Sequence, residues 1–299
     1  MGGDISKNKL LVTSDNILVC SKVVPYFGEV EILPDTLNSR VLLRKKVISK
    51  NIPKHILAEA KTISEANHPH LLSVYGIKET SVQEYEIYFE SISYTLEDEI
   101  RQRRERNEPF TNQEIFSILD QIVSGLAYLQ DRNIAHGGIN SQAILKTPDN
   151  KYKLVHPTLV GKYLPNRTTI ERNMSESELF RFVPPEILPN LQLKPLAESN
   201  LFKEDTYALG VALIDACLLG LTELTMANRM QLIQKDYFPV IFQLMERLID
   251  LNEEDRVDSQ ILSLVTKDQG ILNQVNPGFN KRNPHELPYQ VKILKLMII

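Results

Sequence analysis

Residues 110–129 carry apolar side chains at the spacing of an α-helix, and this segment leads into a loop of small and polar residues. The apolar positions are Ile115, Ile118, Leu119, Ile122, Leu126 and Leu129. This spacing predicts a helix with one continuous buried face. Thr111 followed three residues later by Glu114 predicts a capping box at its start. The helix therefore delivers the chain from a packed core directly to the loop that begins at His136.

The loop at residues 136–145 resembles the catalytic loop of protein kinases. That family's pattern is H-R-D-L-x-x-x-N, in which the Asp accepts the proton of the substrate hydroxyl and the Asn binds Mg²⁺. His136 is present, but Gly138 stands at the Asp position and Ala143 at the Asn position. Neither side chain can accept a proton or bind a metal. The resemblance implies a kinase fold in which this loop lacks the standard chemistry.

Further kinase-like motifs follow along the chain. His156 stands where the family has the Asp of D-F-G, and Mg²⁺ prefers oxygen ligands over imidazole. Glu186 lies in a segment that resembles the end of a kinase activation loop, and Asp205 opens a segment like the buried helix of the large lobe. The resemblance implies that Glu186 pairs with Arg256 and that these residues, with Asp205, are structural.

The amino-terminal motifs resemble a kinase nucleotide site with altered residues. Val23 and Pro25 fall on the first two positions of the Gly-rich loop, and proline has no N–H to offer a phosphate. The strand that carries the phosphate-binding lysine falls on residues 41–44, so that Arg44 replaces the lysine and Leu42 the small residue of the adenine pocket.

The register of that strand leaves one alternative open, because a shift by one residue moves every side chain to the other face. In the shifted register Lys45 takes the lysine position. Glu59 stands where the family has the glutamate partner of this lysine. The resemblance implies a structural role for Glu59, as an ion-pair partner of Arg44 that braces the lobe and does not bind phosphate.

The resemblance covers residues 10–266 and implies an α+β, bilobal protein kinase-like fold, with a β-rich small lobe and a mainly helical large lobe. The expected segments are an amino-terminal segment at 1–9, the small lobe at 10–92, the large lobe at 93–266 and a carboxy-terminal tail at 267–299. The expected function is a catalytically inactive pseudokinase, not an enzyme, that acts as a scaffold or allosteric component of a protein assembly. The alternative is a nucleotide-binding sensor or a kinase-like enzyme with non-standard residues.

Composition agrees with a globular protein. The chain has 299 residues, 42% hydrophobic and 24% charged, which is ordinary for a folded domain of this size. Its net charge of −4 favours no nucleic-acid partner. Two cysteines are too few for a disulfide framework and favour a reducing, cytoplasmic compartment. No cofactor or metal is expected.

The two ends of the chain carry separate signals. Gly2 lies in a pattern typical of N-myristoylation, and the alternative is an unmodified start. A single myristoyl chain would give only a weak membrane tether, so a membrane or cytoskeletal association is the alternative location. The last nine residues, 291–299, are mainly apolar. They either pack on their own domain or dock on a partner.

Overall fold

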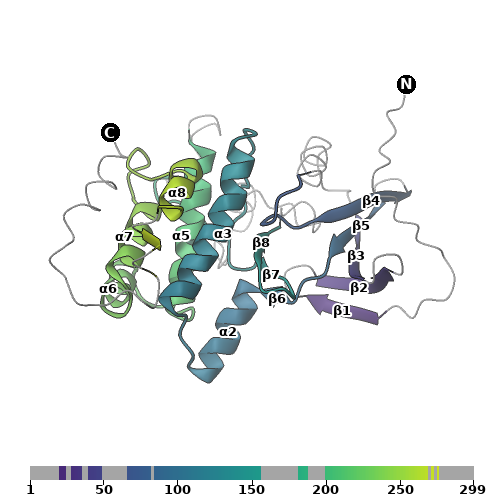
Figure 1. The fold of residues 1–299 in the computed structure, drawn as a ribbon, viewed down its shortest axis with the longest axis horizontal. Coiled ribbons are helices and arrows are strands. Elements are labelled where there is room, and N and C mark those ends of the chain that lie inside the picture. The colour runs from purple at the N-terminus through teal and green to yellow at the C-terminus, as the bar shows by residue number, and fades with distance from the viewer. Residues whose placement is uncertain are drawn as a thin grey trace.

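The computed structural model describes residues 20–24, 28–35, 40–48, 66–81, 84–155, 181–187, 199–268, 271–272 and 275. Figure 1 shows a part built of strands beside a part built of helices, with three short strands at their junction. The expected bilobal α+β architecture is confirmed.

The small lobe is a five-stranded antiparallel sheet in the order β1-β2-β3-β5-β4. Its strands are β1 (Cys20–Val24), β2 (Gly28–Asp35), β3 (Arg40–Ile48), β4 (Val74–Ser81) and β5 (Glu84–Glu90). Strand β3 lies in the middle, paired with β2 on one side and β5 on the other. Its residues therefore have sheet neighbours on both sides, and its two faces are defined by the alternation of side chains.

A three-stranded sheet in the order β6-β7-β8 joins the two lobes. It consists of β6 (Tyr94–Thr95), β7 (Ile144–Lys146) and β8 (Tyr152–Leu154). The backbone N–H of Leu72 donates to the Leu154 carbonyl at 2.8 Å, and the Leu154 N–H donates to the His70 carbonyl at 2.9 Å. The segment that enters β4 is thus bonded directly to β8.

The described helices of the large lobe pack around one apolar core. They are α2 (Leu96–Arg106), α3 (Asn112–Gln130), α5 (Leu201–Cys217), α6 (Met226–Asp236), α7 (Pro239–Leu248) and α8 (Ser259–Thr266). Helix α3 has the expected capping box between Thr111 and Glu114 and buries the predicted apolar face. Helix α5 is buried from Asp205 to Cys217, since α3 and other helices surround it (Figure 1).

Gly210 allows α5 and α7 to approach closely. A Cβ atom at this position would lie 2.7 Å from Leu248 Cβ and 2.8 Å from Ile249 Cγ2. Both distances are shorter than those at which real Cβ atoms contact neighbouring atoms, so the packing of these two helices requires glycine at this position.

Among the helices that the structure describes, none combines the length and the apolar character needed to cross a membrane.

Candidate functional site

The buried helix α5 holds the 136–145 loop through the carboxylate of Asp205. Its Oδ2 accepts the backbone N–H of His136 at 2.7 Å, and its Oδ1 accepts the N–H of Gly137 at 2.8 Å. The side chain is buried, and burial raises the pKa of Asp205 to about 7 against the effect of the two N–H donors, which lower it. Two backbone bonds from one carboxylate fix the direction in which the loop leaves α3.

His136 ties the same loop to the end of β8. Its Nε2 lies 3.0 Å from the Val155 carbonyl oxygen. Burial lowers the pKa of His136 to about 4, so the ring is neutral and its Nε2–H donates to this carbonyl. The histidine therefore has a structural contact at a buried position.

The two altered positions of the loop present no side-chain oxygen. Gly138 is buried, and its carbonyl accepts a bond from the Asn140 amide at 3.3 Å. The side-chain Oδ1 of Asn140 accepts the backbone N–H groups of Gln142 at 2.8 Å and Ala143 at 3.0 Å. Asn140 thus closes a tight turn, which directs the Ala143 methyl group into the protein, where it is fully buried.

Ala143 belongs to an apolar cluster that draws residues from both lobes. This interlobe cluster consists of Val30, Leu43, Leu72, Ile87, Phe89, Ile92, Ala143, Leu145 and Val155. The backbone N–H of Val155 donates to the Ala143 carbonyl at 3.1 Å, which joins β8 to the loop beneath the cluster. Sequence reasoning placed several of these residues in motifs but did not predict that they form one core.

The pairing of β3 places Lys45, and not Arg44, on the face of the sheet that carries the interlobe cluster. Leu43 lies opposite Phe89, and side chains two apart on a strand share a face, so Lys45 follows Leu43. Arg44 lies opposite Glu31 and Tyr88 on the other face. The structure therefore favours the alternative register over the assignment of the lysine position to Arg44.

Arg44 forms an ion-paired cluster on its own face of the sheet. Its Nε donates to Glu31 Oε2 at 2.6 Å, and its Nη1 lies 3.6 Å from Glu86 Oε1. Leu42 shares this face and packs with Leu33 and Tyr88. In the alternative register that the sequence left open, Leu43 instead of Leu42 would take the small position of the expected pocket. The sequence could not separate them, because both leucines are buried.

A partly buried ion pair lies beside the interlobe cluster and was not predicted. Lys153 Nζ on β8 donates to both carboxylate oxygens of Glu90, at 2.7 Å and 2.8 Å. Glu90 Oε1 also accepts the backbone N–H of Ser73 at 2.6 Å. This pair connects the end of β5 with β8, and no local motif marks it because its partners are far apart in the sequence.

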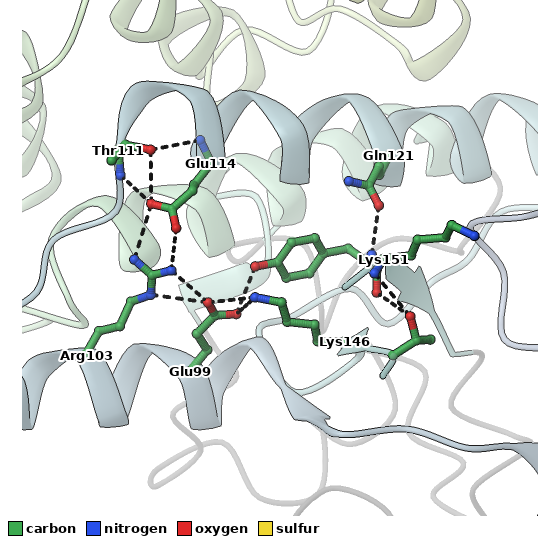
Figure 2. Close-up of polar contacts among 9 residues, drawn as sticks. Glu99, Arg103, Thr111, Glu114, Gln121, Lys146 and Lys151 are labelled. Atoms are coloured by element: carbon green, nitrogen blue, oxygen red, sulfur yellow. Dashed lines mark hydrogen bonds and ion pairs between the residues drawn. The ribbon is translucent and has the colours of Figure 1, made fainter. Parts of the chain in front are cut away.

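A second polar network, shown in Figure 2, is centred on Glu99 of α2. The buried carboxylate of Glu99 accepts bonds from Arg103, from Lys146 Nζ at 3.0 Å and from the Tyr152 hydroxyl at 2.8 Å. Arg103 Nη2 also donates to Glu114 Oε1 at 2.6 Å. Burial and the nearby Glu99 carboxylate raise the pKa of Tyr152. The network joins α2, α3, β7 and β8 and was likewise missed, because it depends on tertiary packing.

The ion pair that the resemblance implies between Glu186 and Arg256 is present. Arg256 Nη2 lies 2.8 Å from Glu186 Oε1, and the arginine side chain is fully buried. Arg256 Nε also donates to the Asp250 carbonyl at 2.9 Å. The guanidinium group therefore fastens the segment 181–187 to the end of the large lobe.

Four of the expected site residues, namely Gly2, Pro25, Glu59 and His156, lie outside the described residues, as do residues 1–9 and the tail from 276 onward. Val23 lies in β1, where it pairs with Glu29.

The kinase fold implies a magnesium nucleotide between the lobes, and the described residues do not fit that group. The side chains of Gly138 and Ala143 offer no oxygen ligand, and the Ala143 methyl group is sealed in the interlobe cluster. Leu43, which shares the face of the interlobe cluster, has a large and buried side chain. Elsewhere in the described part of the chain, no three His, Cys, Asp or Glu side chains are grouped in a way that could hold a metal ion.

Comparisons with known proteins agree with the fold. A family model described as a protein kinase domain matches residues 27–272. The chain is 24% identical over 202 residues to the serine/threonine-protein kinase PLK4 of Drosophila virilis, and the aligned segment covers 66% of this chain and 24% of that protein. It is 26% identical over 157 residues to the serine/threonine-protein kinase PrkC of Bacillus subtilis, covering 52% and 22% of the two chains. It is 31% identical over 106 residues to mitogen-activated protein kinase kinase kinase 3 of Arabidopsis thaliana, covering 36% and 17%.

These relatives correct the expectation that the protein is not an enzyme. They are named as kinases, and the family model that matches this chain is described as a protein kinase domain. The replacements at Gly138 and Ala143 are therefore not sufficient to exclude activity. The relatives do not establish activity either, because the identities lie between 22% and 31%.

The match of residues 27–272 begins just before β2 and takes in the small-lobe sheet from that strand onward, the junction strands and the described helices α2, α3, α5, α6, α7 and α8. It thus covers both lobes and all the contacts described above for the 136–145 loop. The chain belongs to the protein kinase family.

Proposed function

We propose that this kinase domain acts as a scaffold or allosteric component of a protein assembly. One observation carries the proposal: the interlobe cluster packs side chains of both lobes against each other with Phe89, Ala143, Leu145 and Val155 fully buried. The protein's own side chains fill the space between these elements, which favours one arrangement of the two lobes that a partner can recognise.

A fixed arrangement of lobes favours binding to other proteins. Association is opposed by the loss of conformational freedom at the interface, and a preorganised surface reduces this loss. The contacts of Asp205 with the 136–145 loop and of Arg256 with Glu186 hold segments from distant parts of the chain in place. Both contacts are made within the chain and need no ligand, so they can hold a binding surface in place before a partner arrives.

The proposed partners are proteins within a larger complex. The net charge of −4 offers no general attraction to nucleic acid. A myristoyl group on Gly2 would add a weak membrane tether, which supports attachment only together with a second contact.

Sizing of the native protein from its source cells tests the proposal. Gel filtration of a fresh extract should place the protein in a particle larger than its monomer, with the same size after ATP is removed by a nucleotide-hydrolysing enzyme. Elution of all the protein as a monomer, with and without ATP, would contradict the proposal.

A second candidate is a nucleotide-binding sensor or a kinase-like enzyme with non-standard residues. It is favoured by the position of Lys45 on the cleft-facing side of β3. The test is transfer of labelled phosphate by the purified protein and its complex, with Lys45→Met as the diagnostic variant. Arg44→Met is the matched control, because this neighbour is a cation of similar length on the opposite face of the same strand. Transfer that is lost in Lys45→Met and kept in Arg44→Met would establish the second candidate.

A further inference from the structure

The interlobe cluster is continuous from one lobe to the other. Leu43 and Phe89 come from the small-lobe sheet, whereas Ala143, Leu145 and Val155 come from the loop, β7 and the residue after β8. The three large-lobe side chains are fully buried. Side chains that line an open cleft would be exposed to water, so the protein itself covers this surface.

Leu43 has a central position in the cluster. In the sheet register it lies between Ile32 on β2 and Phe89 on β5. It is 4% exposed, and it belongs to the same apolar cluster as Ala143 of the facing lobe. Its neighbour Leu42 is 3% exposed but packs on the opposite face with Leu33 and Tyr88. Two adjacent leucines with equal burial thus lie on different sides of the sheet.

Polar contacts close the region around the cluster. The ion pair between Lys153 and Glu90 connects β8 with the end of β5, and the Leu72 N–H donates to the Leu154 carbonyl. These contacts fix the distance between the sheet and the junction strands. Leu43 thus belongs to a cluster that spans both lobes, and the surrounding bonds hold the elements of that cluster together.

We infer that the Leu43 side chain fills the space between the small-lobe sheet and the facing lobe and thereby determines which ligands the cleft between the lobes admits. The chemical class that it excludes is the planar heteroaromatic ring, because such a ring needs an apolar slot between the sheet and the facing lobe. This inference concerns ligand selection and does not depend on the proposed role in an assembly.

Two single substitutions separate the role of Leu43 from a general effect of cavities. Leu43→Ala and Leu42→Ala each remove the same atoms from a buried site, so both should lower the melting temperature. The probe is adenosine, which has the ring but no phosphate and so does not depend on metal-binding residues. Calorimetric titration should show adenosine binding to Leu43→Ala about tenfold or more tighter than to the wild type. Leu42→Ala should bind adenosine no better than the wild type.

Three results would overturn the inference: adenosine binding to the wild type as tight as to Leu43→Ala, an equal gain in Leu42→Ala, or no gain in a folded Leu43→Ala. If Leu43→Ala does not fold, Leu43→Val removes a single methylene, and the same comparison with Leu42→Val applies. A failure here would leave the native particle size unchanged, so it is distinguishable from a failure of the proposed function.

Discussion

Removal of the Glu186 charge should destabilise the protein measurably, because Arg256 would keep a buried guanidinium group without its carboxylate. Loss of one partner of a buried pair costs about 3–5 kcal/mol. Two features reduce this figure: Arg256 also donates to the Asp250 carbonyl, and the Glu186 side chain is 28% exposed, which allows water to screen the pair. We therefore expect Glu186→Gln to lower the free energy of unfolding by about 2 kcal/mol.

The assay is equilibrium unfolding in urea of the wild type, Glu186→Gln, Arg256→Met and the double variant. If the pair acts as a unit, the double variant should be more stable than the sum of the single effects by about 1 kcal/mol or more. A coupling energy below about 0.5 kcal/mol would refute the reasoning, because distant, independent sites add within that range.

Three further predictions concern residues that hold the fold in place around the candidate site. Burial raises the pKa of Asp205 to about 7, so its contribution to stability is present below the unfolded pKa near 4 and is lost as the pH rises through 7. The urea midpoint of the wild type should therefore fall relative to that of Asp205→Asn between pH 5 and 8. A constant difference between the two midpoints would contradict this. Glu99→Gln should lower the free energy of unfolding by about 2–4 kcal/mol, since Arg103 and Lys146 lose their shared carboxylate, whereas exposed Glu108→Gln should stay within about 0.5 kcal/mol of the wild type by urea denaturation. Gly210→Ala should destabilise the protein by about 1–3 kcal/mol through its clash with Leu248, despite a helix-propensity gain of about 1 kcal/mol. The control is Gly76→Ala, whose added methyl group meets open space. Equal melting temperatures of these two variants would argue against the close approach of α5 and α7.

The elements that could be predicted from the sequence are those fixed by local spacing. Helix α3 followed from the apolar period and from the Thr111–Glu114 capping box. The pairing of Glu186 with Arg256 followed from the resemblance, because both residues lie in recognisable motifs. In each case the chemistry of a short segment determines the local structure.

The register of β3 could not be predicted for a physical reason. The strand has two successive buried leucines, Leu42 and Leu43, so its sequence does not alternate clearly between apolar and polar residues. Only the pairing with β2 and β5 shows which leucine contacts the large lobe, and this places Lys45 in place of Arg44 on the cleft-facing side.

The polar networks around Glu90 and Glu99 were missed because their partners come together only in the folded chain. Lys153 and Glu90 lie in different strands, and Glu99 draws donors from α2, β7 and β8. A buried carboxylate in an amphipathic segment gives no signal until its donors are placed beside it.

The affinity of the protein for a partner recovered from its native particle tests the central claim most directly. The dissociation constant should be measured for the wild type and for Lys45→Met, with and without magnesium ATP. If the domain works as a component of an assembly with a self-closed cleft, the four values should agree within about twofold. A loss of about tenfold, equal to 1.4 kcal/mol, in Lys45→Met or on removal of ATP would contradict the account.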